Sequence, residues 1–160
     1  MPVDPKILAL FTEMVRSRSH PASGFLKPGP VRYVRNSAGK RVIYAAQTYA
    51  GALLEVLVHA NLGIVPKTQA VVEISIPENV SIETIAGDEL EGWAADDLIV
   101  TRRFGDQWLD ERRSAVLLVP SVVLQGRELN VLINPDHSDF VRIKTTSPET
   151  VIWDPRLFSR

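Results

Sequence analysis

The stretch Tyr49–Ala60 reads YAGALLEVLVHA, and Glu55 is its only formally charged residue. A helix drawn through it is apolar on nearly every face, which predicts that the helix is buried in the folded protein. Thr48 is a good N-cap for this helix, and Gly63 is placed to end it near Asn61. Burying a lone carboxylate is costly unless the group is paired or neutralised, so Glu55 is the first candidate functional residue.

Two interpretations of Glu55 are open. In the functional one, its carboxylate forms the floor of a cleft, and Gly51, one turn earlier on the helix, makes room there for a ligand. In the structural interpretation, one side of the helix is exposed to solvent, and Glu55 contacts water or a structural arginine there. Carboxylates in unusual surroundings mark functional sites only statistically, so the residues alone do not decide between the two.

Further elements are predicted on both sides of this helix. Towards the N-terminus we expect a helix over about residues 4–16, then a hairpin of two strands, Val31–Arg35 and Arg41–Ala46. Towards the C-terminus the patterns predict a strand at Gln69–Ile76, a helix at Thr101–Arg113, and strands at Ala115–Val119, Leu129–Ile133, Phe140–Lys144 and Val151–Trp153. These elements predict one α+β domain spanning residues 1–160, with a mixed or antiparallel sheet and flanking helices.

Composition excludes several functional classes. The chain has 160 residues, of which 45% are hydrophobic and 23% charged, and it contains no cysteine. Disulfide frameworks, thiolate nucleophiles and sulfur-based zinc sites are therefore excluded, and the three histidines lack metal-ligand spacing, so no metal is expected. A net charge of −1 gives no overall attraction to nucleic acid or anionic lipid. No apolar stretch approaches the roughly 20 residues of a membrane-spanning helix, so we expect a cytoplasmic protein without membrane contact.

Other polar residues near the predicted hairpin and strands could belong to a site. Alternation along the first hairpin strand places Arg32 on one face and Tyr33 and Arg35 on the other, and arginine suits phosphate or carboxylate. Tyr44 lies towards the end of the second strand, and Ser121 follows the strand at Ala115–Val119. Each has an ordinary structural explanation, as a solvated charge, a core aromatic or a turn serine. His137, in the sequence NPDH, is expected to cap or close a turn.

Four blocks of sequence carry a family resemblance. They are VIYAAQTYAGALLEVLVHA (residues 42–60), LLVPSVVL (117–124), LNVLINPDHSDF (129–140) and WDPRLF (153–158). In these blocks the chain resembles the RES-domain family, and its short N-terminal half looks most like the ParT-type toxins. The resemblance implies a fold similar to that of the ADP-ribosyltransferases.

The resemblance also implies a function. RES proteins are toxins of type II toxin–antitoxin pairs that consume NAD as a substrate and need no metal. The ParT-type members imply a mono-ADP-ribosyltransferase that modifies a host protein, phosphoribosyl pyrophosphate synthetase, and a partner that is an Xre-like antitoxin blocking the active site. The alternative within the family is an NAD glycohydrolase or phosphorylase that depletes cellular NAD.

The family's site residues map onto this chain one by one. Its glutamate corresponds to Glu55, its tyrosine to Tyr44, its serine to Ser121 and its early strand arginine to Arg32. The family's Gly-rich loop and Gly-Gly-Arg-Trp segment are absent, so Arg35 or Arg41 is expected to replace the second arginine. The resulting prediction has catalytic and NAD-binding groups at Glu55, Arg32, Tyr33, Arg35, Tyr44, Gly51 and Ser121.

Two other classes of function remain as alternatives. A ribonuclease toxin could use Arg102–Arg103 and Arg112–Arg113, although the net charge of −1 opposes it. A non-catalytic binding module would make Glu55 a purely structural residue. Replacing Glu55 with glutamine distinguishes these classes, because NAD chemistry requires the carboxylate and a binding module does not.

Overall fold

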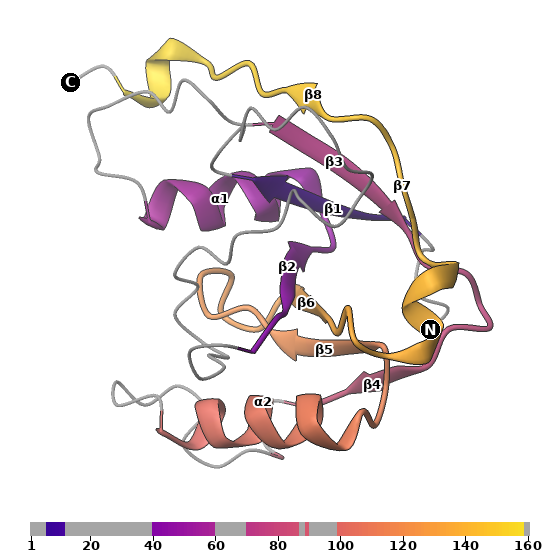
Figure 1. Ribbon diagram of the computed structural model, residues 1–160. Helices are drawn as coiled ribbons and strands as arrows, with labels where there is room; N and C mark the ends of the chain where they lie inside the picture. The colour runs from indigo at the N-terminus through magenta and orange to yellow at the C-terminus, as the bar shows by residue number, and fades with distance from the viewer. Residues whose placement is uncertain (1–5, 12–39, 60–69, 87–88, 90–98, 159–160) are drawn as a thin grey trace.

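A computed structural model describes residues 6–11, 40–59, 70–86, 89 and 99–158, including the backbone but not the side chains of residues 6–11 and 59 (Figure 1). The two α-helices are α1 (Tyr49–His59) and α2 (Ile99–Glu111). The strands are β1 (Lys6–Phe11), β2 (Ile43–Ala46), β3 (Ala70–Ser75), β4 (Ile82–Thr84), β5 (Val116–Pro120), β6 (Leu129–Ile133), β7 (Lys144–Thr145) and β8 (Glu149–Thr150). Short 3-10 helices cover Ser138–Arg142 and Pro155–Leu157.

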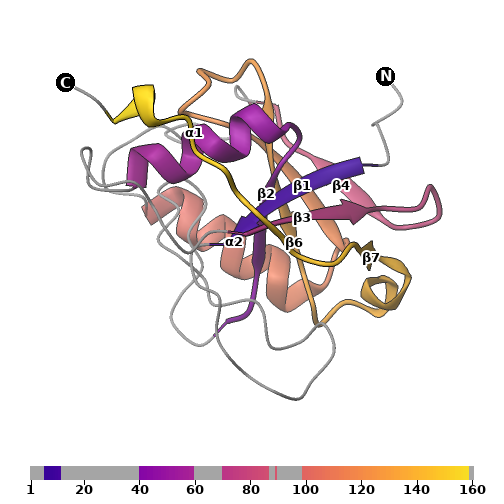
Figure 2. The same cartoon turned by 90° about the horizontal axis from the view of Figure 1, so that it is seen from above.

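The described strands form one mixed sheet in the order β4-β5-β6-β2-β1-β3-β7, and β8 also pairs with β3. Only β4 and β5 run parallel among these pairs, and the others are antiparallel. In Figure 1, α1 lies beside the β1 and β2 part of the sheet, and α2 runs along the β4 and β5 part. Figure 2 shows the same arrangement from above. The predicted α+β fold with a mixed sheet and flanking helices is confirmed.

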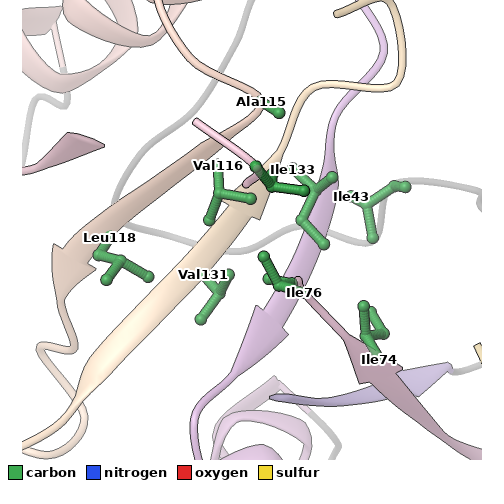
Figure 3. Packing of buried hydrophobic residues seen from close by; sticks show 9 residues of the cluster. Ile43, Ile74, Ile76, Ala115, Val116, Leu118, Val131 and Ile133 are labelled. Carbon is green, nitrogen blue, oxygen red and sulfur yellow. The ribbon is translucent and has the colours of Figure 1, made fainter. Parts of the chain in front are cut away.

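Strands β5 and β6 are buried on both faces of the sheet. This agrees with the sequence of β5, which is a continuous apolar run, as is typical of strands covered on both sides. On one face, Val116 and Leu118 pack with Val131 of β6 and with residues of β2 and β3 (Figure 3). On the other face, Leu117 packs with Trp108 of α2. The second face matters for function, since the side chains that follow in this alternation belong to the candidate site.

The elements richest in apolar pattern were predicted correctly. The helices expected at residues 49–61 and 101–113, and the strands expected at 41–46, 69–76, 115–119 and 129–133, are present within a few residues. Thr48 caps α1 as predicted, since its Oγ1 accepts a hydrogen bond from Gly51 N at 2.9 Å. The other strand of the predicted hairpin, Val31–Arg35, and the helix end at Gly63 lie outside the described residues.

Three predictions near the chain ends were wrong. Residues Lys6–Phe11 form a strand rather than part of a helix, and all six pair with β3. The apolar run KILALF is compatible with either structure, and long-range pairing with β3 decides it. The strand expected at 140–144 is mostly a 3-10 helix, with β7 only at its end. The strand expected at 151–153 lies earlier, at β8, while Val151 and Trp153 pack into the core instead.

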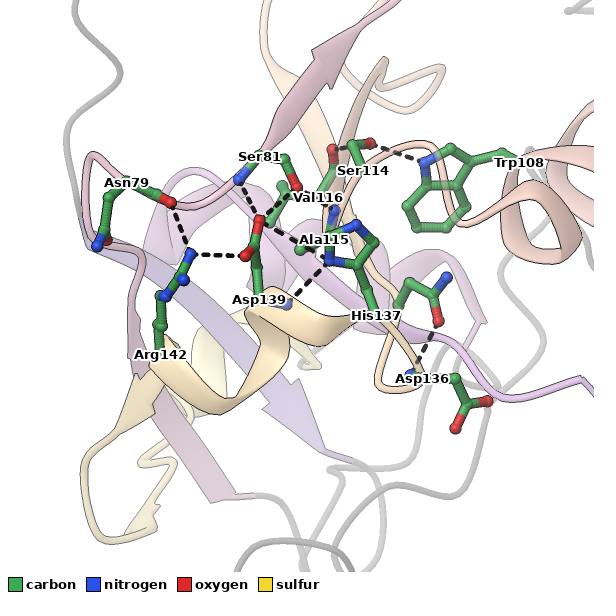
Figure 4. A network of polar contacts seen from close by, with 11 residues as sticks. Asn79, Ser81, Trp108, Ser114, Ala115, Val116, Asp136, His137, Asp139 and Arg142 are labelled. Carbon is green, nitrogen blue, oxygen red and sulfur yellow. Dashed lines mark hydrogen bonds and ion pairs between the residues drawn. The ribbon is translucent and has the colours of Figure 1, made fainter.

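The 3-10 helix at Ser138–Arg142 is held by a polar network around Asp139 (Figure 4). Its Oδ2 accepts hydrogen bonds from Ser81 Oγ at 2.8 Å and from Ser81 N at 3.1 Å. Its Oδ1 accepts from Arg142 Nη1 at 2.6 Å. His137 caps this helix through Nδ1, which accepts from Asp139 N at 3.0 Å, so the predicted turn-capping role of His137 is confirmed. The network joins the loop after β6 to the start of β4.

This network predicts a dependence of stability on pH. The hydrogen bonds from Ser81, followed by the positive charge of Arg142, hold the pKa of Asp139 below its ordinary value. A carboxyl with a depressed folded-state pKa stabilises the fold above about pH 4, and this contribution is lost as the pH falls through the folded-state pKa. We expect the free energy of unfolding in urea to fall less between pH 7 and pH 3 for Asp139→Asn than for the unsubstituted protein.

A matched control is Asp110→Asn, because Asp110 lies on the exposed part of α2 and pairs only with Lys40 among the ion pairs of the described residues. We expect its pH profile to follow that of the unsubstituted protein. Equal losses of stability in Asp139→Asn and in the unsubstituted protein would show that Asp139 contributes no acid-labile stability.

Candidate active site

Glu55 lies at the centre of the candidate site, held by side chains from two other parts of the chain. Its Oε1 accepts a hydrogen bond from Ser121 Oγ at 3.0 Å and another from Asn130 Nδ2 at 2.9 Å. Glu55 is half-buried, whereas Ser121 and Asn130 are only 0% and 6% exposed. The carboxylate is therefore fixed in orientation by two buried and uncharged donors.

The sheet explains why these donors reach Glu55. Asn130 lies in β6 between Ala46 of β2 and Val119 of β5, so strands on both sides fix its backbone. Ser121 follows directly after β5, and its N donates to Glu128 O at 2.9 Å. The chain between these two residues is thus a short loop between neighbouring antiparallel strands, and it brings both side chains to the same end of the sheet.

The loop from Ser121 to Glu128 is also tied to the start of α1. Thr48 Oγ1 donates to Glu128 Oε2 at 2.7 Å, and Leu129 N donates to Gln47 Oε1 at 3.0 Å. At the tip of the loop, Gln125 and Gly126 take positive φ angles of 53° and 74°. The helix that carries Glu55 and the loop that carries Ser121 are consequently fixed to each other.

Gly51 is used differently from what the sequence suggested. A Cβ at this position would lie 2.9 Å from Glu128 Oε2 and 3.3 Å from Leu124 Cδ1. The space left by its missing side chain is therefore occupied by the loop of this same chain. The interpretation that Gly51 leaves room for a ligand needs correction, because its lack of a side chain allows the close approach of α1 and the loop.

Tyr44 lies on the same face of the sheet as Asn130. In the register of β2 and β6, Tyr44 is opposite Leu132, two residues beyond Asn130, which makes Tyr44 and Asn130 diagonal neighbours. Tyr44 is half-buried and packs against the cluster that contains Trp108. The register thus places Tyr44 on the same face of the sheet as Asn130, whose amide donates to Glu55.

The structure gives a position for only one of the three predicted site arginines, Arg41. Arg32, Tyr33 and Arg35 lie outside the described residues, so their place in the site stays a prediction. Arg41 forms an ion pair with Asp136, at the opposite end of β2 from Ala46. It therefore lies away from Glu55 in this structure, which does not favour it as the replacement for the family's second arginine.

Sequence reasoning missed Asn130. A signal was available, because Asn130 is the only polar residue in the strand LNVLI. A buried amide in an apolar strand needs partners, and such groups often serve a site or hold a network together. Asn130 lies within one of the four family blocks, but its contact with Glu55 joins residues 75 positions apart and could not be read from spacing.

The arrangement can stabilise positive charge that develops beside it. A carboxylate held by preorganised donors does not need to reorient when a cation forms, and such electrostatic preorganisation is usually the largest catalytic contribution. Within the part of the chain that the structure describes, no three His, Asp or Glu side chains gather as a metal-binding group. None of the described helices combines the length and the apolar character needed to cross a membrane.

Comparisons with known proteins add independent information. The family model described as the RES domain matches residues 13–154. A protein of Sphingobium sp. named "Prs ADP-ribosylating toxin" is 40% identical over 129 residues, which cover 78% of this chain and 80% of the relative. A Pseudomonas putida protein named "Toxin Res" is 34% identical over 125 residues, covering 77% and 83% of the two chains. A Yersinia enterocolitica protein with the same name is 31% identical over 124 residues, covering 76% and 81%.

Proposed function

The chain belongs to the RES-domain family, and from this premise we propose that it is a toxin that consumes NAD and transfers ADP-ribose to a host protein. The observation that supports this most is the half-buried Glu55, held at Oε1 by Ser121 and Asn130. A fixed carboxylate with uncharged donors suits a reaction in which positive charge appears on a sugar. The relative named as an ADP-ribosylating toxin supports the same reaction class.

The proposed reaction begins by breaking the bond between ribose C1′ and the nicotinamide nitrogen. The electron pair of that bond goes to the nitrogen, which is cationic in NAD and leaves neutral, so no strong general acid is needed. Positive charge builds on the ribose, as in glycoside cleavage, and the carboxylate of Glu55 stabilises it. A nucleophile of the acceptor protein then forms a bond to C1′ and loses its proton to solvent water.

The remaining predicted residues have roles in this reaction. Arg32 would anchor the pyrophosphate of NAD, since a guanidinium offers several donors to phosphate oxygens. Tyr44 would orient the nicotinamide by stacking, and Ser121 acts on Glu55 through the hydrogen bond described above. Tyr33 and Arg35 complete the proposed binding surface for NAD.

The name of one relative supports the proposed acceptor, and the family resemblance is the basis for the proposed partner. The Sphingobium protein is named for Prs, and we propose phosphoribosyl pyrophosphate synthetase as the acceptor for this chain too. The proposed partner is an Xre-like antitoxin that blocks the active site. The protein would act in the cytoplasm, where both NAD and this acceptor occur.

The experiment incubates the purified protein with NAD labelled on the adenylate phosphate, with and without purified phosphoribosyl pyrophosphate synthetase. Both nicotinamide release and label on protein are measured. We expect label on the synthetase together with nicotinamide release. Nicotinamide release without protein label would instead identify an NAD glycohydrolase, or a phosphorylase if it requires inorganic phosphate. Intact NAD under all conditions would refute the proposed function.

A further inference from the structure

We propose that Asn130 is a positioning residue that orients the carboxylate of Glu55 for NAD cleavage. This inference rests on the proposed function and extends it to a residue for which neither the sequence reasoning nor the comparisons give a role. Asn130 Nδ2 donates to Glu55 Oε1 at 2.9 Å, and Ser121 Oγ donates to the same oxygen at 3.0 Å. Two donors on one oxygen fix the plane of the carboxylate and give its two oxygens different surroundings.

Asn130 is well placed for this role because its backbone cannot move easily. It pairs with Ala46 on one side and with Val119 on the other, in the middle of the sheet. Its side chain is buried, with 6% of the residue exposed. Ser121, by contrast, lies in a loop, so Asn130 is the donor to Glu55 that comes from a rigid strand. Site residues held by strands are positioned more accurately than those held by loops.

The amide group also suits the chemistry. It donates a hydrogen bond without carrying a charge, and it does not ionise in the working range of pH. Asn130 can therefore hold Glu55 without cancelling the negative charge that the proposed reaction uses. It does not touch the reacting atoms in this scheme, and its effect passes through Glu55.

The first test compares Asn130→Ala and Asn130→Asp with the unsubstituted protein in the NAD assay. We expect Asn130→Ala to lower kcat about ten- to a hundredfold, the usual effect of removing a hydrogen bond to a charged group, with little change in KM for NAD. In Asn130→Asp two carboxyl groups share the site, and they cannot both ionise easily. Its activity relative to the unsubstituted protein should therefore rise as the pH falls from 8 to 5, because a protonated aspartic acid donates to Glu55 again.

A matched control is Asn134→Asp, since Asn134 is buried just beyond the other end of β6 and bonds to Leu109 O and Asp136 N. A loss of activity caused only by burying an ionised aspartate should also be relieved by protonation in Asn134→Asp, so the positioning role predicts a larger recovery of kcat at low pH in Asn130→Asp than in this control. The double variant Asn130→Ala with Glu55→Gln should be no slower than Glu55→Gln alone. An additive loss in the double variant, or unchanged kcat in Asn130→Ala, would overturn the positioning role.

A second measurement keeps this inference separate from the proposed function. The side-chain amide resonances of Asn130 should shift in the NMR spectrum when Glu55 is replaced by alanine, whether or not the protein consumes NAD. If the protein leaves NAD intact while these resonances respond, the proposed reaction fails and the contact stands. If the resonances do not respond, the contact itself is refuted and Asn130 does not position Glu55.

Discussion

Glu55→Gln is expected to lower NAD turnover by about a hundredfold to a thousandfold, the typical effect of removing a key electrostatic group from an active site. Glutamine has nearly the same shape as glutamate, and its carbonyl oxygen can still accept from Ser121 and Asn130. The substitution therefore removes the negative charge and little else. The loss should appear in kcat, because the charge acts mainly on the cation that forms as the bond breaks.

The measurement is nicotinamide release by the two proteins at equal concentration, with circular dichroism to verify folding. Glu83→Gln is the control, since Glu83 lies on β4, away from Glu55, and forms an ion pair with Arg113. We expect it to retain nearly full activity. If Glu55→Gln also retained full activity, Glu55 would be a structural residue, and the proposal of NAD chemistry at this site would fail.

Trp108→Ala is expected to cost about 3–5 kcal/mol of unfolding free energy, the usual range for removing a large aromatic from a core. Trp108 is fully buried, packs with Leu117 and Leu132, and donates from Nε1 to Ser114 Oγ at 2.8 Å. Its loss opens a cavity under α2 and removes the donor to the buried Ser114 hydroxyl, which keeps only its own bond to Val116 O. Since whole domains are stable by only about 5–15 kcal/mol, this one residue accounts for a large share of the total.

Urea unfolding measures this loss, and Ser114→Ala separates its two parts. Ser114→Ala keeps the indole ring but leaves its N–H without its acceptor, which should cost about 1–3 kcal/mol. The exposed control Val141→Ala, at a residue 85% exposed, should change stability by less than about 0.5 kcal/mol. A loss in Trp108→Ala no larger than that in Val141→Ala would show that this cluster does not hold α2 to the sheet.

Much of the fold could be predicted because several segments carry strong local patterns. The run in α1 and the apolar strands β5 and β6 have few alternatives, and Thr48 marks a helix start. The segment KILALF has no such local signal, and its strand forms through pairing with β3, about 65 residues later in the chain. Near the C-terminus, the turn made by His137 and Asp139 replaced a predicted strand through contacts to the distant Ser81.

Some residues of the candidate site could likewise be predicted from the sequence, and others could not. Glu55 could be found from the sequence, because a single carboxylate in an apolar helix needs an explanation. Ser121 and Tyr44 came from the family resemblance, since each has an ordinary structural explanation by itself. No role could be assigned to Asn130 from the sequence, because its hydrogen bond to Glu55 forms only when the two distant segments fold together. The missing side chain of Gly51 could be recognised from the sequence as leaving space beside α1. That the loop before β6 fills this space could not be predicted.

The sequence separation of the contacts to Glu55 has a consequence for the cell that makes this protein. Glu55 lies 66 residues before Ser121 and 75 residues before Asn130, and both must be in place to orient it. A nascent chain that has not yet emerged from the ribosome past residue 121 carries the glutamate without either donor, and one that ends before residue 130 still lacks Asn130. By this logic, translation products that end before β6 would lack the oriented glutamate and would not carry out the proposed reaction.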